Sequence, residues 1–278
     1  MKAIAKQISE GLSGYYTAGE VSALTRIIAT ELLGVSQMAF YLKDDIPLTA
    51  GQQTLLDNAI ERLKKQEPIQ YILGYSDFCG LRFKVTQATL IPRPETSELV
   101  EWIASEATGN ESILDIGTGS GCIAISLAHK LPQSKVTAWD ISNDALAVAA
   151  ENSKANGQAV TFEQVDILAY QPSGKQFDII VSNPPYIKEN EKAAMHSNVL
   201  DWEPHTALFV PDSDPLLFYR TIAKKGLILL KPGGSLYFEI NRAHGKETME
   251  MLESLGYTSI ELRKDFAEND RMIRAIKN

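Results

Sequence analysis

The chain has 278 residues, enough for one large domain or for one domain with a smaller companion. Hydrophobic residues make up 44% and charged residues 22% of it, an ordinary globular composition that excludes a disordered or fibrous protein. Its 27 Lys and Arg against 35 Asp and Glu give a formal net charge of −8, which disfavours a strongly basic face that tracks nucleic acid.

The first part of the chain, residues 1–73, shows only helical patterns. Apolar residues recur at helical spacing over residues 24–32 and again over residues 55–63. Thr49 is expected to cap the start of the second of these helices, and Pro68 is expected to end it. A small bundle packed on its own core is predicted, and its place ahead of the remaining chain suggests a substrate-recognition domain.

Residues 74–92 change period and are predicted to form a β-hairpin linker. Short strands are expected around positions 83–85 and 90–91, with Gly80 at a turn, and Glu95 then opens a helix.

The third region, residues 93–278, alternates strands with helices. Helices are expected to begin near Gly121, Asn143, Asp214 and His244. Short apolar strands that alternate with helices predict a mainly parallel sheet covered on both faces, hence an α/β fold. Residues 188–212 lack a clear period and are expected to form a long functional loop. The seven predicted strands are residues 112–116, 135–140, 159–164, 177–182, 234–240, 258–263 and 272–276.

A glycine-rich segment, residues 115–121, follows the first of these strands and precedes a helix. Glycines let the backbone approach a ligand closely, and the free N–H groups of the helix start suit a carboxylate. A dinucleotide or S-adenosylmethionine could bind there, but the spacing is G-x-G-x-G, whereas dinucleotide sites prefer G-x-G-x-x-G. The candidate cofactor-binding residues of the segment are Gly117, Thr118, Gly119, Ser120 and Gly121.

Two acidic residues close the next two predicted strands. Asp140 could accept hydrogen bonds from both ribose hydroxyls, and Asp166 could accept one from an adenine amino group, with Ile167 against the base. Each aspartate alone could equally begin a turn. Because open sheets bind ligands at the carboxyl ends of their strands, three successive strand ends with suitable groups favour a cofactor site.

The tetrapeptide Asn183-Pro184-Pro185-Tyr186 follows a buried strand. It could be only a rigid turn. In the chemical interpretation, the Asn183 side-chain oxygen and the Pro184 carbonyl accept the two N–H groups of a planar nitrogen and position its lone pair for attack on an activated methyl. Tyr186 can stack on a flat substrate. Asn183 is then an acceptor rather than a general base, and no metal is required.

Together these two segments resemble the class I S-adenosylmethionine-dependent methyltransferases that modify planar nitrogens. Further motifs are similar to those of bacterial release factor glutamine methyltransferases, from about residue 67 to the C-terminus. Two departures are Ser97, where that family usually has Glu, and residues 239–244, which replace a common Glu-Ile-Gly-x-x-Gln. The matching motifs lie at residues 68–74, 78, 80, 90–96, 182–187, 203–204, 207–208 and 231–234.

The resemblance implies a catalytic domain with a Rossmann-like seven-stranded sheet. It implies that S-adenosylmethionine is held there by the glycine segment, Asp140, Ile167 and Asn183. After the reaction the cofactor would leave as S-adenosylhomocysteine. It implies Asn183 and Pro184 as catalytic residues, and a substrate amide held by residues 183–186. The substrate would be the glutamine of the Gly-Gly-Gln loop in class 1 peptide chain release factors. Arg93 and Glu95 would shape the rim of the site, or else form a salt-bridged helix start.

Other properties are expected from the residue inventory. With only Cys79 and Cys122, reduced thiols of a cytoplasmic protein are expected and a cysteine-rich zinc site is excluded. No signal peptide or membrane-spanning run is apparent, and we expect a monomer that binds neither membrane nor nucleic acid. A metal or histidine-based site has little support because the four histidines are scattered, at His129, His196, His205 and His244.

Three alternatives remain open. An adenine-N6 nucleic-acid methyltransferase would present an exocyclic amine in similar geometry, after flipping the base. A nicotinamide-dependent dehydrogenase would leave the Asn183–Tyr186 tetrapeptide unused. A non-catalytic module could keep the fold without turnover.

Overall fold

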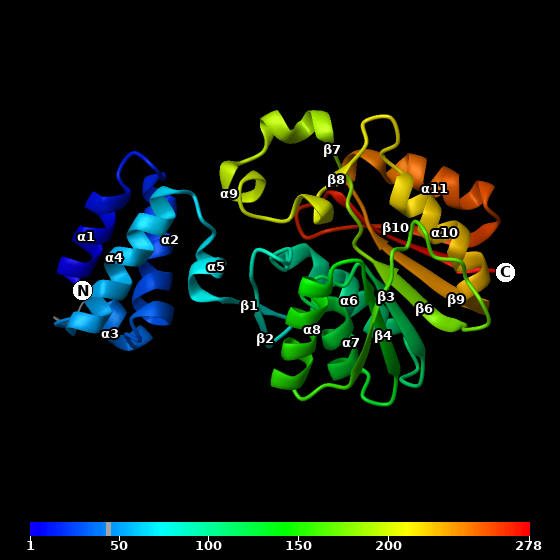
Figure 1. The fold of residues 1–278 in the computed structure, drawn as a ribbon, viewed down its shortest axis with the longest axis horizontal. Coiled ribbons are helices and arrows are strands. Elements are labelled where there is room, and N and C mark those ends of the chain that lie inside the picture. The colour runs from blue at the N-terminus through cyan, green and yellow to red at the C-terminus, as the bar shows by residue number, and fades with distance from the viewer. Residues whose placement is uncertain (43–45) are drawn as a thin grey trace. The chain divides into compact units, whose positions relative to one another are not determined.

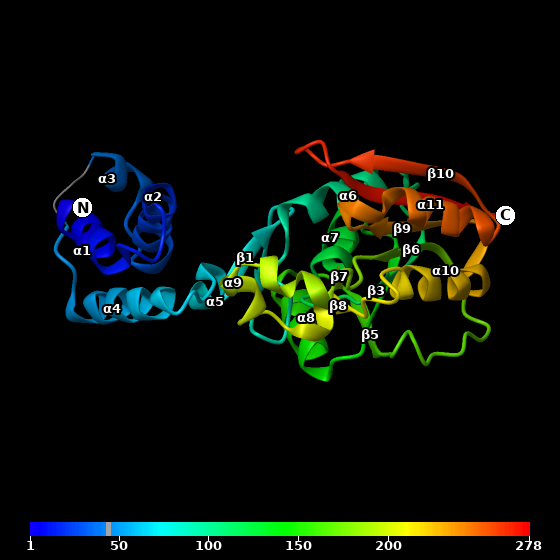
Figure 2. The ribbon, with the colours of Figure 1, turned by 90° about the horizontal axis from the view of Figure 1, so that it is seen from above.

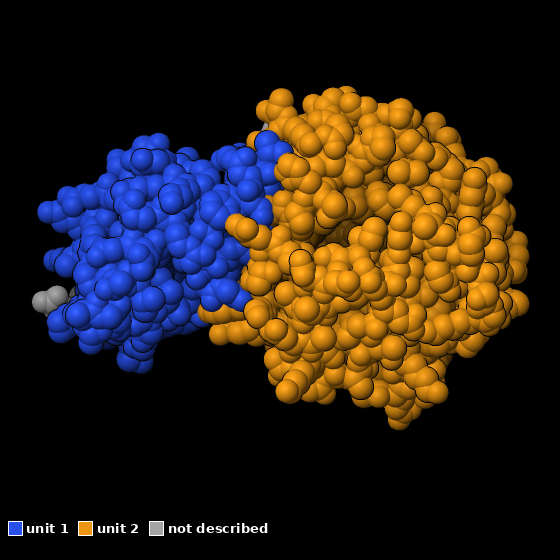
Figure 3. Space-filling model, in the orientation of Figure 1, with its two compact units in different colours: residues 1–74, 196–202 blue, residues 75–195, 203–278 orange. Residues whose placement is uncertain are grey.

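The computed structural model of the protein describes residues 1–42 and 46–278. The chain divides into two compact units (Figure 3). The helical unit comprises residues 1–74 and 196–202, and the sheet unit comprises residues 75–195 and 203–278. None of the helices among the described residues is long and apolar enough to cross a membrane.

The elements described in the helical unit are all helices, as predicted for residues 1–73. Its core is formed by apolar side chains that the helices bury between them, among them Ile8, Leu12, Ile28, Leu56 and Leu63. The elements are α1 (Lys2–Leu12), α2 (Ala18–Ile27), the π-helix η1 (Ile28–Leu32), α3 (Gln37–Leu42), α4 (Ala50–Lys64), α5 (Ile69–Leu73) and α9 (Ser197–Leu200).

The predicted cap of α4 is confirmed. Thr49 Oγ1 accepts the Gln52 N–H at 3.2 Å, and the Gln52 side chain accepts the Thr49 N–H at 3.0 Å, which is a capping box. The prediction that Pro68 ends this helix is wrong. The helix ends at Lys64, and Pro68 is instead the residue before α5, where its missing N–H leaves no hydrogen bond unmade.

The sheet unit begins with the predicted hairpin. β1 (Tyr75–Phe78) pairs antiparallel with β2 (Leu81–Lys84), and Gly80 lies in the turn with φ of +77°. The predicted strand at Leu90 and Ile91 is wrong. The N–H of Ile91 bonds the side chain of Glu203 rather than a neighbouring strand.

A seven-stranded sheet forms the centre of this unit, in the order β10-β11-β9-β6-β3-β4-β5. β9, β6, β3, β4 and β5 run parallel, and β11 pairs antiparallel with both β9 and β10. The predicted mainly parallel α/β fold is thus confirmed. The strands are β3 (Ser112–Ile116), β4 (Lys135–Asp140), β5 (Val160–Gln164), β6 (Phe177–Ser182), β9 (Leu230–Glu239), β10 (Tyr257–Lys264) and β11 (Asp270–Lys277).

Helices cover both faces of the sheet (Figures 1 and 2). Successive residues of β3 point to opposite faces, so Ile113 packs in the core beside α6 and α7, and Leu114 packs in the core beside α10 and α11. The helices are α6 (Pro94–Glu106), α7 (Cys122–Lys130), α8 (Asn143–Ala155), α10 (Leu217–Leu229) and α11 (Gly245–Ser254).

The predicted loop at residues 188–212 is not structureless. The two-residue strand β7 (Ile187–Lys188) pairs parallel with β8 (Phe209–Val210), and the 3-10 helices η2 (Glu189–Ala194) and η3 (His205–Ala207) lie between them. Elements this short show no period in the sequence, which explains why the prediction missed them. Their pairing fixes residues 206–209 close to the end of β6.

Candidate active site

The predicted ligand-binding groups meet at one edge of the sheet. Because β6, β3, β4 and β5 are adjacent and parallel, their carboxyl ends lie side by side. Gly117, Asp140, Asp166 and Asn183 follow or end these strands, and all four line a cavity of about 360 Å³. The remaining lining residues are Leu90, Ile116, Gly119, Ile141, Val165, Ile167, Leu168, Ser182, Pro184, Pro185, Thr206, Ala207, Phe209, Phe218 and Ile222.

The glycine segment is fastened to the neighbouring strand. The N–H groups of Gly117 and Thr118 donate to the Trp139 carbonyl at 2.8 and 3.0 Å. The Gly119 N–H donates to Asp140 Oδ2 at 2.8 Å. Asp140, predicted as a ligand for ribose, therefore also fixes the shape of the loop beside it.

Three residues of the predicted cofactor set do not line the cavity: Thr118, Ser120 and Gly121. Thr118 and Ser120 are buried. Gly121 directly precedes α7 and has φ of +81°, and a Cβ there would lie 2.7 Å from Ile125 and 3.1 Å from Ala149. Glycine at this position allows the turn into α7 and the close approach of α8.

Asp115 lies under the loop and is fully buried. Its Oδ2 accepts the Thr118 hydroxyl at 2.6 Å, whereas its buried Oδ1 has no partner among the described residues. Burial raises the pKa of Asp115 to about 7, and the hydrogen bond from Thr118 opposes this shift. Burial also raises the pKa of Asp140, although backbone N–H groups stabilise its charged form.

The end of β5 differs in detail from the prediction. The strand ends at Gln164, so Asp166 lies in the following turn, where its Oδ1 accepts the Leu168 N–H at 2.8 Å. The predicted turn role of Asp166 is therefore present, and the residue lines the cavity as well.

Several apolar lining residues were missed by the sequence reasoning, and two of them are largely exposed. Ile141 and Leu168 line the cavity although 55% and 43% of their surfaces are exposed. Ile141 directly follows Asp140, which ends β4, and Leu168 lies two residues beyond Asp166 in the turn after β5. An aliphatic residue in such a place is the signal that could have identified them. Large exposed aliphatic side chains beside a cavity are typical of the walls that hold a flat ligand.

The Asn183–Tyr186 segment continues β6. Asn183, Pro184 and Pro185 line the cavity, whereas Tyr186 does not, and its side chain packs against the core on the α10 side of the sheet. The Tyr186 carbonyl accepts the side-chain amide of Asn241 at 3.3 Å. The segment is therefore supported from the end of β9.

The other predicted substrate residue, Glu95, is partly buried in the first turn of α6 and also lies outside the cavity lining. Its neighbour Arg93 donates to Glu203 Oε1 at 2.6 Å, and the Glu203 side chain is only 1% exposed. Burial raises the pKa of Glu203, and Arg93 opposes the shift. This ion pair joins the segment beside Leu90 to the one beside Thr206, both of which line the cavity.

No group of three or more metal-ligating side chains occurs within residues 1–42 and 46–278.

Two family models match the chain. Residues 95–201 match the methyltransferase small domain, and residues 6–74 match the PrmC N-terminal domain.

Curated relatives are similar over almost the whole chain. A release factor glutamine methyltransferase of Bacteroides thetaiotaomicron is 50% identical over 276 residues, which cover 99% of each protein. One of Flavobacterium psychrophilum is 46% identical and covers 96% of each. Among solved structures, a methyltransferase from Pyrococcus furiosus has a TM-score of 0.54 at 18% identity, covers 83% of this chain and 100% of that one, and supports the fold alone.

The buried Asp115 predicts a specific dependence of stability on pH. Between about pH 4 and pH 7 the folded protein keeps a proton on this carboxyl that the unfolded chain has lost, so its contribution to stability falls as pH rises. The total effect is at most on the order of 4 kcal/mol. In Asp115→Asn, urea unfolding should give a shallower decline in unfolding free energy from pH 5 to pH 8 than in the wild type. Parallel declines in both proteins would contradict this assignment.

Proposed function

The chain belongs to the family of release factor glutamine methyltransferases, and we propose from this that it methylates the N5 amide nitrogen of the glutamine in the Gly-Gly-Gln motif of class 1 peptide chain release factors. The observation that carries the proposal is the 50% identity to a named family member across 99% of both chains. The proposed donor is S-adenosylmethionine, which supplies an electrophilic methyl group on a sulfonium.

The residues around the cavity fit this donor. Backbone groups at Gly117 and Gly119 allow close approach, and the Asp140 carboxylate suits ribose hydroxyls. Ile141 and Leu168 present apolar surface for the adenine ring, and Asp166 supplies an acceptor beside it. A donor bound in this way would direct its methyl group toward Asn183, the lining residue at the end of β6.

The proposed chemistry rests on Asn183 and Pro184. A glutamine amide is a weak nucleophile because its lone pair is delocalised into the carbonyl. The Asn183 Oδ1 and the Pro184 carbonyl would accept its two N–H groups and hold the nitrogen in line with the methyl. The nitrogen forms the new N–C bond as the C–S bond breaks and neutral S-adenosylhomocysteine leaves. The methylated nitrogen, which is then cationic, loses one proton to water. Neither residue has to act as a base.

We also propose that the helical unit contacts the release factor. Its residues 6–74 match a domain model distinct from the methyltransferase domain, which favours a separate role. Three exposed large hydrophobic side chains on or beside α3, Met38, Tyr41 and Leu42, offer apolar surface for a protein partner. The proposed partner is thus a protein, in keeping with the net charge of −8, and no nucleic acid is required.

A comparison of two possible substrates tests the proposal. The purified chain is incubated with methyl-labelled donor and with either a class 1 release factor or duplex DNA that contains adenine. Label should enter the release factor, and mass spectrometry should locate it on the glutamine of Gly-Gly-Gln. Label in the DNA alone would favour the adenine-N6 alternative and overturn the proposed substrate.

Asn183→Ala tests the methyl-transfer residues. The variant should bind S-adenosylhomocysteine with nearly the affinity of the wild type, while kcat falls roughly ten- to a thousandfold, a loss of ~1.4–4 kcal/mol in positioning. Single-turnover rates and calorimetry measure the two quantities separately. Unchanged turnover would remove Asn183 from its proposed role.

Asp140→Ala tests the donor site. Loss of charged hydrogen bonds should weaken donor binding by about 1.5–3 kcal/mol. Part of this loss would come from the Gly119 N–H, which the variant leaves without its carboxylate partner. Calorimetry with S-adenosylhomocysteine measures the change, and retained affinity would contradict the ribose assignment.

A further inference from the structure

The turn that follows β5 forms one wall of the cavity, where Asp166, Ile167 and Leu168 all belong to the lining. Asp166 binds N–H groups of this turn. Its Oδ1 accepts the Leu168 N–H at 2.8 Å, and its carbonyl accepts the Tyr170 N–H at 2.8 Å. The carbonyl groups of the same turn have a different partner, on α10.

That partner is the ammonium group of Lys225. Its Nζ donates to the carbonyl oxygens of Ile167, Leu168 and Tyr170 at 2.5, 3.1 and 2.6 Å. Three acceptors match the three N–H groups of an ammonium, so the arrangement fits the charged form of lysine. Burial lowers the pKa of Lys225, whereas the nearby Asp166 carboxylate favours the charged form. Because bonds from a charged donor are stronger than neutral ones, this single side chain can hold the whole turn.

The helix α10 presents Lys225 on a face that also contributes to the cavity. Phe218 and Ile222 of this helix both line the cavity. Ile222 follows Phe218 by four positions and Lys225 follows Ile222 by three, so the three side chains lie along one face. Ile222 and Ile167 also belong to the same buried apolar cluster. The helix therefore supplies part of the wall together with the group that fixes the adjoining part.

We propose that Lys225 is a positioning residue for the methyl donor, because it fixes the turn at residues 166–168 that would hold the adenine ring. A wall that is ordered before the ligand arrives does not have to lose conformational freedom on binding. Without the ammonium, the three carbonyls would have to find water, and the turn that carries them would lose its anchor on α10. The inference deepens the proposed function, since it rests on binding of the proposed donor in this cavity.

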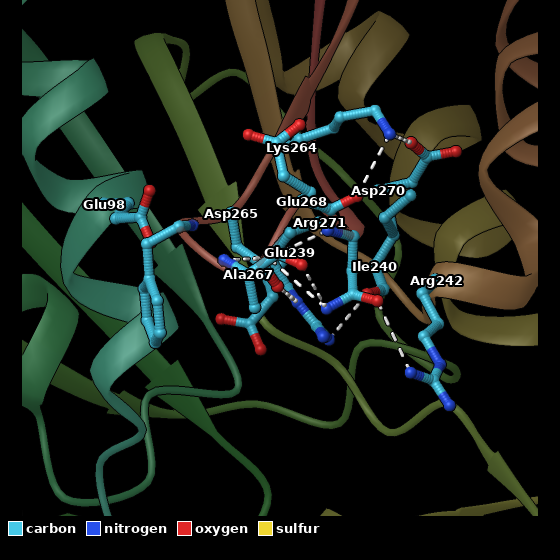
Figure 4. A network of polar contacts seen from close by, with 12 residues as sticks. Glu98, Glu239, Ile240, Arg242, Lys264, Asp265, Ala267, Glu268, Asp270 and Arg271 are labelled. Carbon is cyan, nitrogen blue, oxygen red and sulfur yellow. Dashed lines mark hydrogen bonds and ion pairs between the residues drawn. The ribbon is translucent and has the colours of Figure 1, made fainter.

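A purely structural role is the alternative, because other turns of the sheet unit are fastened by a charged side chain as well. In the turn between β10 and β11, Asp265 Oδ1 accepts the backbone N–H groups of Ala267 and Asn269 at 2.9 Å each (Figure 4). Asp265 Oδ2 accepts Arg271 Nε at 3.0 Å. None of these four residues lines the cavity, whereas two of the three residues that Lys225 binds do. That difference connects Lys225 with the ligand site.

Three variants separate the two roles. Lys225→Met removes the ammonium and keeps a long, unbranched side chain. Lys225→Arg tests for rescue, because a guanidinium can also donate to several carbonyls. Lys224→Met is the matched control, since Lys224 precedes Lys225 on the same helix, is exposed and lies outside the cavity lining.

The first measurement is calorimetry with S-adenosylhomocysteine. Lys225→Met should bind it roughly five- to fiftyfold more weakly than the wild type, because the turn must become ordered on binding. Lys225→Arg should recover part of this loss, and Lys224→Met should bind as the wild type does. A structural role alone would lower the urea midpoint of unfolding and leave the affinity unchanged. Unchanged affinity in Lys225→Met would therefore overturn the inference and leave the proposed function intact.

Methylation of a release factor adds a kinetic measurement. In Lys225→Met the KM for the donor should rise by a similar factor, while kcat at saturating donor changes less than about threefold. A fall in kcat without a rise in this KM would contradict a role in donor binding. A wild type that bound S-adenosylhomocysteine but did not methylate the release factor would reject the proposed substrate, while calorimetry would still decide the role of Lys225.

The last measurement uses only the wild-type protein. If the contacts of Lys225 favour donor binding, donor binding must favour those contacts, because coupling between two equilibria is reciprocal. Acetylation of Lys225 requires its amine to leave the three carbonyls. Bound S-adenosylhomocysteine should therefore slow acetylation of Lys225 about fivefold or more and leave Lys224 unaffected, as measured by mass spectrometry. An equal rate at Lys225 with and without the ligand would overturn the inference, even should Lys225→Met fail to fold.

Discussion

The site depends on the parallel pairing of four neighbouring strands, β6, β3, β4 and β5. In parallel strands all carboxyl ends lie at one edge of the sheet. Residues of β3 and β6 that are 66 positions apart in the sequence are therefore neighbours in the sheet. The hydrogen bond from Gly119 to Asp140 then joins two of these ends into one rigid surface. A loop fixed in this way can hold a ligand without first having to become ordered.

Several carboxyl groups lie around this edge of the sheet, and burial disfavours the charged form of each. Asp115, Asp140, Glu203 and Glu239 all have a raised pKa with desolvation as the main cause. Buried charges destabilise a fold unless they are hydrogen-bonded or paired. Their concentration around one cavity is typical of a functional site, since folding alone would be served equally well by apolar residues there.

Features that repeat along the chain could be predicted from the sequence. Strands β3, β4 and β6 coincide with their predicted ranges because each is a short, mainly apolar segment followed by a turn signal. Gly117, Asp140 and Asn183 could be predicted because each ends or directly follows a strand that is itself visible in the sequence. The pair β7 and β8 was missed because two-residue strands have no period, and Ile141 was missed because an exposed aliphatic side chain is unremarkable until the cavity beside it is known.

The contacts that orient the site could not be read from the sequence for a different reason. Thr96 and Glu239 are 143 residues apart, and Arg93 and Glu203 are 110 apart, so no local pattern connects them. The Arg93–Glu203 pair joins two segments that both carry lining residues, whereas Thr96 and Glu239 join α6 to β9, neither of which lines the cavity. Methyl transfer needs a nitrogen, a carbonyl and a methyl group aligned within a fraction of an ångström, and Asn183 alone cannot fix its own amide. One support for the Asn183–Tyr186 segment comes from outside the cavity lining, since the side-chain amide of Asn241, just beyond the end of β9, donates to the Tyr186 carbonyl.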